Sequence, residues 1–203
     1  MSMAASHQIS LSLAGLKWPA FLFAFSGVRW YHNHMKLKIN ERTAFNSPTY
    51  GRLTMDSVMW KILSFISQDT YAEYEIAVGT DSMTHGRHNT KFALVISVHK
   101  VGKGGIYFFK TFRTGRVDEL HQKLTMETQL SVDTADFLIK SLGKRLAHKD
   151  SRIHLVIHMD IGENGPTSRL INELGGWVSA MGFEYAIKPD SYASSTLADR
   201  ASK

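Results

Sequence analysis

The sequence predicts an α/β fold: a five-stranded mixed sheet, made of a three-stranded antiparallel meander and two parallel strands, with helices on both faces. Two observations carry this prediction. Three apolar segments follow one another on short polar connections between residues 74 and 113, as in a meander. After them, strand-like segments alternate with segments of helical periodicity, as in strand–helix–strand crossovers. The chain has 203 residues, the size of one domain.

The first half of this domain is expected to hold one helix and the meander. A helix over residues 54–68 begins at a threonine that can cap it, and its apolar residues recur at helical spacing. The three strands follow at 74–80 (YEIAVGT), 91–100 (KFALVISVHK) and 106–113 (IYFFKTFR). The first strand closes at Asp81 and leads into a polar loop, so Asp81 is expected at the end of a buried strand.

The second half alternates helices and strands. The expected order is a helix from 118 to about 148, a strand over 152–160, a helix over 166–181, a strand over 183–188 and a short C-terminal helix. The long helix is either one bent helix or two helices that meet near Ser131. The strand over 152–160 closes at Asp160. Ser194 can cap the last helix, which carries Asp199.

Residues 1–45 differ from the domain expected over residues 46–203. Their apolar stretch, 10–27, contains Lys17 and Pro19 and is shorter than a usual membrane span. It lacks a basic segment before it and a small-residue cleavage site, so it is a poor signal peptide and indicates no clear membrane association. An atypical targeting or anchoring segment, a disordered extension, and residues upstream of a true start at Met35 all remain open.

Composition limits the chemistry that is available. The chain has no cysteine, which excludes disulfides, thiolate zinc sites and cysteine nucleophiles and fits a cytoplasmic protein. The formal net charge is +6, but residues 1–45 carry five cations against one anion, a balance of +4. The expected domain therefore has only +2, and the basic character of the chain is weak evidence for nucleic-acid binding.

Four carboxylates are candidate site residues: Asp81, Glu127, Asp160 and Asp199. The two at 81 and 160 close expected strands, and the two at 127 and 199 lie on expected helices. In the expected fold all four can meet at one end of the sheet. Clustered carboxylates repel one another unless cations lie among them, and oxygen-only ligands suit Mg²⁺ or Mn²⁺. Each also has an ordinary interpretation: an Asx turn for Asp81, a solvated charge for Glu127, loop ordering for Asp160, and an ion pair with Arg200 for Asp199.

Further polar residues are candidates for contact with a phosphate-containing substrate: Ser82, Arg169, Lys188 and Ser194. The alternative is an ordinary strand–loop–helix junction with a capping serine. His158 shares a strand face with Asp160 and either assists the site or is a hydrogen-bonded core histidine. Five cations of the meander form either a basic edge or a solvated face: Lys100, Lys103, Lys110, Arg113 and Arg116.

Local motifs add a family resemblance. VGTDS at 78–82, MET at 126–128, HMDIGENGPTSRLI at 158–171 and IKPDSYASSTLADR at 187–200 resemble the bacterial YkuK family of ribonuclease H-like proteins. The resemblance covers roughly residues 50–203. It implies a ribonuclease H-like fold with a potential acidic metal site.

The leading functional hypothesis is a divalent-metal-dependent nuclease. It would hydrolyse phosphodiester bonds in RNA, RNA–DNA hybrid or structured DNA by a two-metal mechanism. Asp81 would bridge the two ions, Glu127 and Asp160 would each hold one, and Asp199 would complete one shell. The alternatives are a non-catalytic nucleic-acid-binding or regulatory module that retains the fold, and a hydrolase acting on a small phosphate ester.

Overall fold

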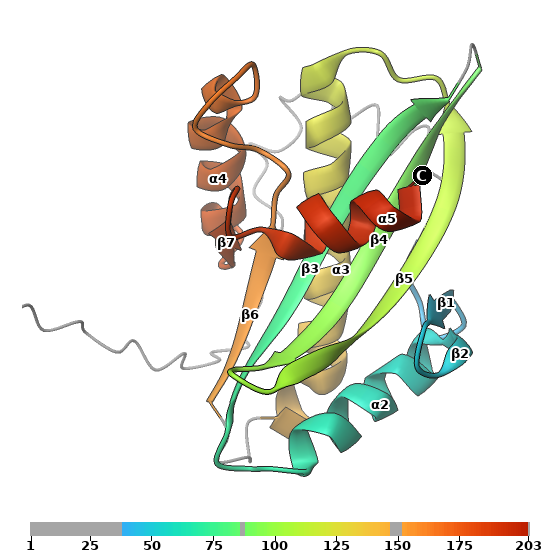
Figure 1. Cartoon of the computed structure of the whole chain (residues 1–203), viewed down its shortest axis with the longest axis vertical. Helices are drawn as coiled ribbons and strands as arrows, with labels where there is room; N and C mark the ends of the chain where they lie inside the picture. Colours follow the sequence, from blue (N-terminus) through green and yellow to red (C-terminus); the bar gives the residue numbers. More distant parts are fainter. Residues whose placement is uncertain (1–37, 86–87, 147–151, 203) are drawn as a thin grey trace, which may run out of the picture.

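The structure, a computed structural model, describes residues 38–85, 88–146 and 152–202. These residues form one seven-stranded sheet in the order β2-β1-β5-β4-β3-β6-β7 (Figure 1). Its centre is the antiparallel meander β3 (Glu73–His85), β4 (Asn89–Lys100) and β5 (Gly104–Gly115). Beside β3, the strands β6 (Arg152–His158) and β7 (Glu184–Ala186) run parallel to one another and to β3. The predicted mixed α/β fold is therefore confirmed.

Two short strands extend the sheet beyond the five that were expected. β1 (Ala44–Ser47) and β2 (Gly51–Thr54) form a hairpin, and β1 continues the sheet next to β5 through the pair Asn46 and Phe109. β1 begins two residues before residue 46, where the domain was expected to start. Segments of four residues carry too little periodicity to be recognised from sequence.

The helices lie on both faces of the sheet. α2 (Met55–Ser67) begins at Thr54, whose hydroxyl oxygen accepts a hydrogen bond from the Ser57 backbone N–H at 3.3 Å, as predicted. α3 (Leu120–Leu146) is a single helix of 27 residues. Together with η2 (Ser168–Leu170) and α4 (Ile171–Ala180), these helices share the main hydrophobic core with one face of the sheet.

The C-terminal segment covers part of the opposite face. The π-helical turn η3 (Ala193–Ala198) and α5 (Asp199–Ser202) cross in front of β3, β4 and β5 (Figure 1). The contact is close, because a Cβ atom at Gly79 would lie 2.6 Å from the Ser194 backbone nitrogen. The prediction that Ser194 caps the last helix is wrong. The turn begins one residue after Tyr192, and the Ser194 hydroxyl donates to the Ser191 carbonyl oxygen at 3.1 Å.

Several expected boundaries also differ. β3 continues to His85 instead of closing at Asp81, which is paired with Ala93 of β4. Pairing with β4 thus converts the expected polar loop into strand. β6 ends at His158, so Asp160 follows the strand by two residues. β7 and α4 are shorter than expected.

Within residues 38–85, 88–146 and 152–202, no helix is both long and apolar enough to cross a bilayer. The apolar stretch over 10–27 and the alternative start at Met35 lie outside the described residues, and so do the interpretations that were attached to them.

Candidate functional site

The candidate site lies where β6 ends beside β3. The parallel pairing of these strands runs as far as Gly79 and His158, and no described strand pairs with β3 on that side beyond this point. Asp81 and Ser82 lie on this stretch of β3. Because neighbouring residues of a strand point to opposite faces, Ser82 faces α3, and Asp81 lies on the face that η3 and α5 cross.

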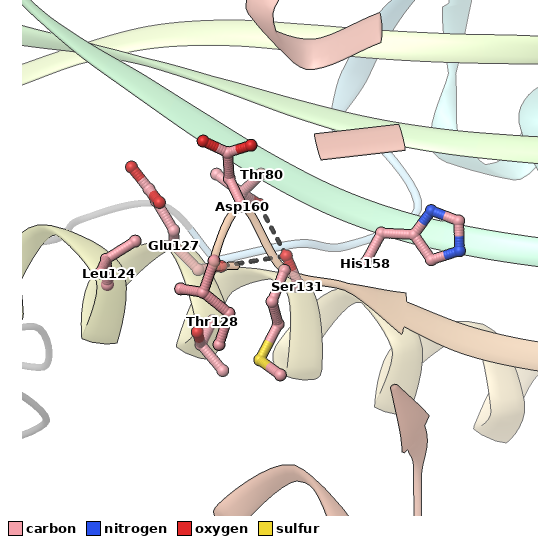
Figure 2. A pocket seen from close by; sticks show the side chains of 9 residues that line it. Thr80, Leu124, Glu127, Thr128, Ser131, His158 and Asp160 are labelled. Carbon is pink, nitrogen blue, oxygen red and sulfur yellow. Dashed lines mark hydrogen bonds between the residues drawn. The ribbon is translucent and has the colours of Figure 1, made fainter. Parts of the chain in front are cut away.

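Glu127 approaches this edge from α3. Its side chain is 6% exposed, and the Ser82 hydroxyl donates to its Oε1 at 2.6 Å. One turn further along α3, the Ser131 hydroxyl lies 2.8 Å from the Thr80 hydroxyl and donates to the Glu127 carbonyl oxygen at 3.0 Å. These contacts fix the turn of α3 that carries Glu127 against β3. Figure 2 shows Ser131 between Thr80 and the Glu127 backbone.

The electrostatics of Glu127 link it to two other predicted acids. Burial and, after it, the negative charge of Asp81 raise the pKa of Glu127 to about 8, and Asp160 adds to the rise. The hydrogen bond from Ser82 and the charge of Lys123 act in the opposite direction but do not compensate. As long as no divalent cation is bound, Glu127 therefore keeps its proton at neutral pH.

Asp160 lies in the same hollow as Glu127, and Figure 2 shows their carboxyl groups on the same side of the strand end. The Lys188 ammonium donates to Asp160 Oδ2 at 3.1 Å and lies 3.0 Å from Oδ1. Oδ1 is itself buried and accepts no hydrogen bond from the described residues. Lys188, expected to contact phosphate, is thus paired with a candidate ligand.

Asp199 reaches the region from α5. It is the first residue of that helix and is partly exposed, and α5 packs on the sheet face that carries Asp81. The part of the chain that the structure describes contains no group of three or more His, Asp or Glu side chains arranged to hold a metal ion. In the structure the charges of Asp81 and Asp160 therefore act on Glu127, but these side chains are not arranged as a complete set of metal ligands.

The other predicted contact residues lie in different surroundings. Arg169 is exposed on η2, in the segment that follows Asp160. Ser82 is buried with its hydroxyl on Glu127, and Ser194 is fully buried beside Gly79. Of these three side chains, that of Arg169 is the accessible one.

His158 belongs to the core. It is 2% exposed, and its Nδ1 accepts a hydrogen bond from the Ala193 backbone N–H at 3.1 Å. Burial lowers the pKa of His158 to about 4, so the ring is neutral at pH 7. In Figure 2 the ring points away from Asp160. Of the two interpretations, the hydrogen-bonded core histidine describes it, and its contact anchors the start of η3.

Sequence reasoning missed the roles of Gly79, Thr80 and Ser131. Two signals were available. Glu127 and Ser131 are spaced i,i+4 and so lie on one side of α3. Thr80 and Ser82 alternate in a strand and so share one face. Nothing in the local sequence shows that η3 approaches Gly79.

The donor set fits a hard divalent cation. It offers carboxylate oxygens alone, of the kind that Mg²⁺ and Mn²⁺ prefer. Among the described residues, Asp160 Oδ1 is buried and accepts no hydrogen bond, with only the Lys188 ammonium at 3.0 Å, and the pKa of Glu127 is raised by burial and then by neighbouring negative charge. A divalent cation bound between these groups would coordinate the Asp160 oxygen and offset the repulsion at Glu127.

Comparisons with known proteins agree with this architecture. A family model described as Ribonuclease H-like matches residues 57–203. A protein of Bacillus subtilis (strain 168), named "Uncharacterized protein YkuK", is 31% identical over 167 residues, which cover 78% of this chain and 96% of that protein. No solved structure gives a significant match.

Proposed function

Because this chain belongs to the ribonuclease H-like family, we propose that it is a divalent-metal-dependent hydrolase of phosphodiester bonds in nucleic acid. The family supports a nucleic-acid-related function. The observation that carries the finer proposal is the raised pKa of Glu127, because Asp81 and Asp160 contribute to it in addition to burial. An acid whose pKa is shifted by burial together with neighbouring acids is a candidate functional group.

The proposed ligands are Asp81, Glu127, Asp160 and Asp199, and the proposed ions are Mg²⁺ or Mn²⁺. When bound, such ions activate a water molecule and stabilise the leaving oxygen of the phosphodiester. Glu127 must lose its proton to act as a ligand, and the hydrogen bond from Ser82 favours its ionised form. Ser82 is therefore a positioning residue for Glu127.

Lys188 has two roles in this proposal. Its ammonium lies 3.0 Å from the nearer oxygen of Asp160 and neutralises that carboxylate as long as no metal ion is bound. Once a cation takes over that role, the exposed ammonium is available to a phosphate of the substrate. Arg169, exposed after Asp160, is proposed as a second phosphate contact. Ser194 holds η3 and thereby positions Asp199. A cytoplasmic location is part of the same proposal.

Cleavage assays test the proposal. Labelled RNA, RNA–DNA hybrid and branched DNA are incubated with Mg²⁺ or Mn²⁺ and, separately, with a chelator. We expect cleavage only in the presence of the ion. In Asp81→Asn the cleavage rate should fall by more than roughly 100-fold, which exceeds the loss usual for residues that do not bind the metal directly. Asp136→Asn is the matched control, because it also removes one Asp carboxylate, but one that pairs with Lys140 on α3 and is not a proposed ligand, so cleavage should be unchanged. Cleavage unchanged by the chelator or by Asp81→Asn would contradict the proposal.

A second candidate is a nucleic-acid-binding module that does not cleave. The ion pair between Lys188 and Asp160 favours it, because that carboxylate already has a cationic partner. Such a module would bind the same nucleic acids equally well with and without divalent ions and leave them intact. Hydrolysis of a chromogenic phosphate ester, with all polymers uncut, would instead indicate a small substrate.

A further inference from the structure

The sheet face that carries Asp81 is only partly covered. In Figure 1, η3 and α5 cross β3, β4 and β5, and these strands continue past the two helices toward the β3–β4 turn. The strand register shows what lies there. Asp81 pairs with Ala93 of β4, and two residues further along the same face Met83 pairs with Lys91, which in turn pairs with Arg113 of β5. Two cations therefore stand side by side, one same-face step beyond Asp81.

Placing these two cations opposite each other is electrostatically unfavourable, and no contact with another described residue offsets the repulsion. Like charges directly opposite each other on neighbouring strands are destabilising. Lys91 is partly exposed and Arg113 is exposed, and neither side chain makes an ion pair or hydrogen bond with another described residue. An anion bound between them would remove the repulsion.

Other cations of the meander are occupied or face elsewhere. Lys100 forms an ion pair with Asp69 at 2.7 Å, and Arg116 forms one with Asp118 at 2.6 Å. The Lys110 ammonium donates to the Ala44 carbonyl oxygen at 3.4 Å, on the opposite face from Arg113. The basic edge that the sequence suggested is therefore not a single surface, and Lys91, which was not part of it, joins Arg113.

We propose that Lys91 and Arg113 bind the phosphate backbone of the nucleic-acid strand whose reacting phosphodiester lies at Asp81. The strand then crosses the exposed ends of β4 and β5. One same-face step along a strand is about 7 Å, a distance comparable with the separation of neighbouring phosphates. Arginine can hold a phosphate through two parallel hydrogen bonds, and lysine adds a point charge. This inference rests on the proposed function and adds the direction from which the substrate approaches.

The salt dependence of binding tests the pair. Affinities of wild type and of the double variant Lys91→Gln/Arg113→Gln are measured for fluorescent single-stranded RNA and for an RNA–DNA hybrid, at several KCl concentrations and with a chelator to prevent cleavage. Each lost phosphate contact lowers the slope of log affinity against log salt by roughly 0.7 for a single strand and 0.9 for a duplex. We expect the slope to fall by roughly twice these amounts.

Two further variants separate this role from general charge and from folding. The control Lys103→Gln/Arg152→Gln removes two exposed cations at the other end of the sheet, in the β4–β5 turn and at the start of β6. Its slope should stay close to that of wild type. The exchange Lys91→Arg/Arg113→Lys keeps both charges and should restore the slope.

The outcomes are distinct. An unchanged slope in the Gln double variant, or an equal fall in the control, would overturn the inference, and cleavage that still depends on Asp81 would leave the proposed function standing. Failure of wild type to bind either nucleic acid would overturn both. A reduced slope in the Gln variant, with restoration in the exchange variant, supports the inference.

Discussion

Replacing Glu127 with glutamine isolates the electrostatic state of the candidate site. Glutamine has the shape of the protonated acid and can still accept the hydrogen bond from Ser82. It cannot ionise, so the free energy of unfolding of the variant lacks the pH dependence that comes from the Glu127 proton. The raised pKa of Glu127 predicts both the sign and the size of this change.

The magnitude follows from the raised pKa. The folded protein holds the Glu127 proton up to a pKa of about 8, whereas the unfolded chain releases it near the ordinary value of 4.5. Between these values the unfolded state binds fewer protons, so stability falls as pH rises. One pKa unit corresponds to about 1.4 kcal/mol, so the loss from pH 4.5 to 7 is roughly 3 kcal/mol. Glu127→Gln should therefore be more stable than wild type by about this amount at pH 7.

Urea denaturation at pH 5, 7 and 9, with a chelator present, measures the effect. The difference in free energy of unfolding between variant and wild type should be small at pH 5 and grow to pH 9. Glu163→Gln, which removes an exposed carboxylate of the loop after Asp160, is the control and should show no such growth. A variant that is less stable than wild type at pH 7, or a difference that does not change with pH, would refute the reasoning.

Three other predictions concern the surroundings of the site. Gly79→Ala should lower the free energy of unfolding by about 1–3 kcal/mol, because its Cβ would meet the backbone of η3 at 2.6 Å. In Gly176→Ala the new Cβ meets nothing within 4 Å, so that helix variant should be neutral or slightly more stable in the same urea titration. Lys188→Gln should bind Mn²⁺ several-fold more tightly by calorimetry, because the ion no longer competes with an ammonium for Asp160; equal affinity would contradict this. The pKa of His158 is about 4 in the folded protein, against an ordinary 6.5, so the unfolded chain binds more protons between these values and the free energy of unfolding decreases as pH falls through them. His158→Gln should abolish this decrease in urea titrations between about pH 4 and 7. If variant and wild type instead lose stability in parallel, the ring is not buried in its neutral form.

Periodicity was enough to predict most of the fold. Residues 74–80 and 91–100 are apolar and strand-like, and the capping threonine before α2 is a local signal with a local effect. What failed depended on partners distant in sequence. Ser82 to His85 resemble a polar loop, but pairing with β4 makes them strand. Ser194 looks like a cap, but the close approach of η3 to Gly79 buries it.

The sequence indicates candidate residues for the site but not how they are arranged. Asp160 could be placed near the end of a strand because an apolar run precedes it, whereas Asp81 lies within β3, which continues to His85. The register shows that Asp81 lies on the opposite face from Ser82, which contacts Glu127. The ion pair between Lys188 and Asp160 joins residues 28 apart, and no sequence pattern indicates it.

The most direct test of the acidic site is a crystal soaked in Mn²⁺ and measured for anomalous scattering. We expect a peak bounded by Asp81 and at least one of Glu127 and Asp160, with Lys188 moved away from Asp160. If manganese is absent from this region in crystals that bind it elsewhere, and Lys188 stays on Asp160, then these carboxylates do not form a metal site.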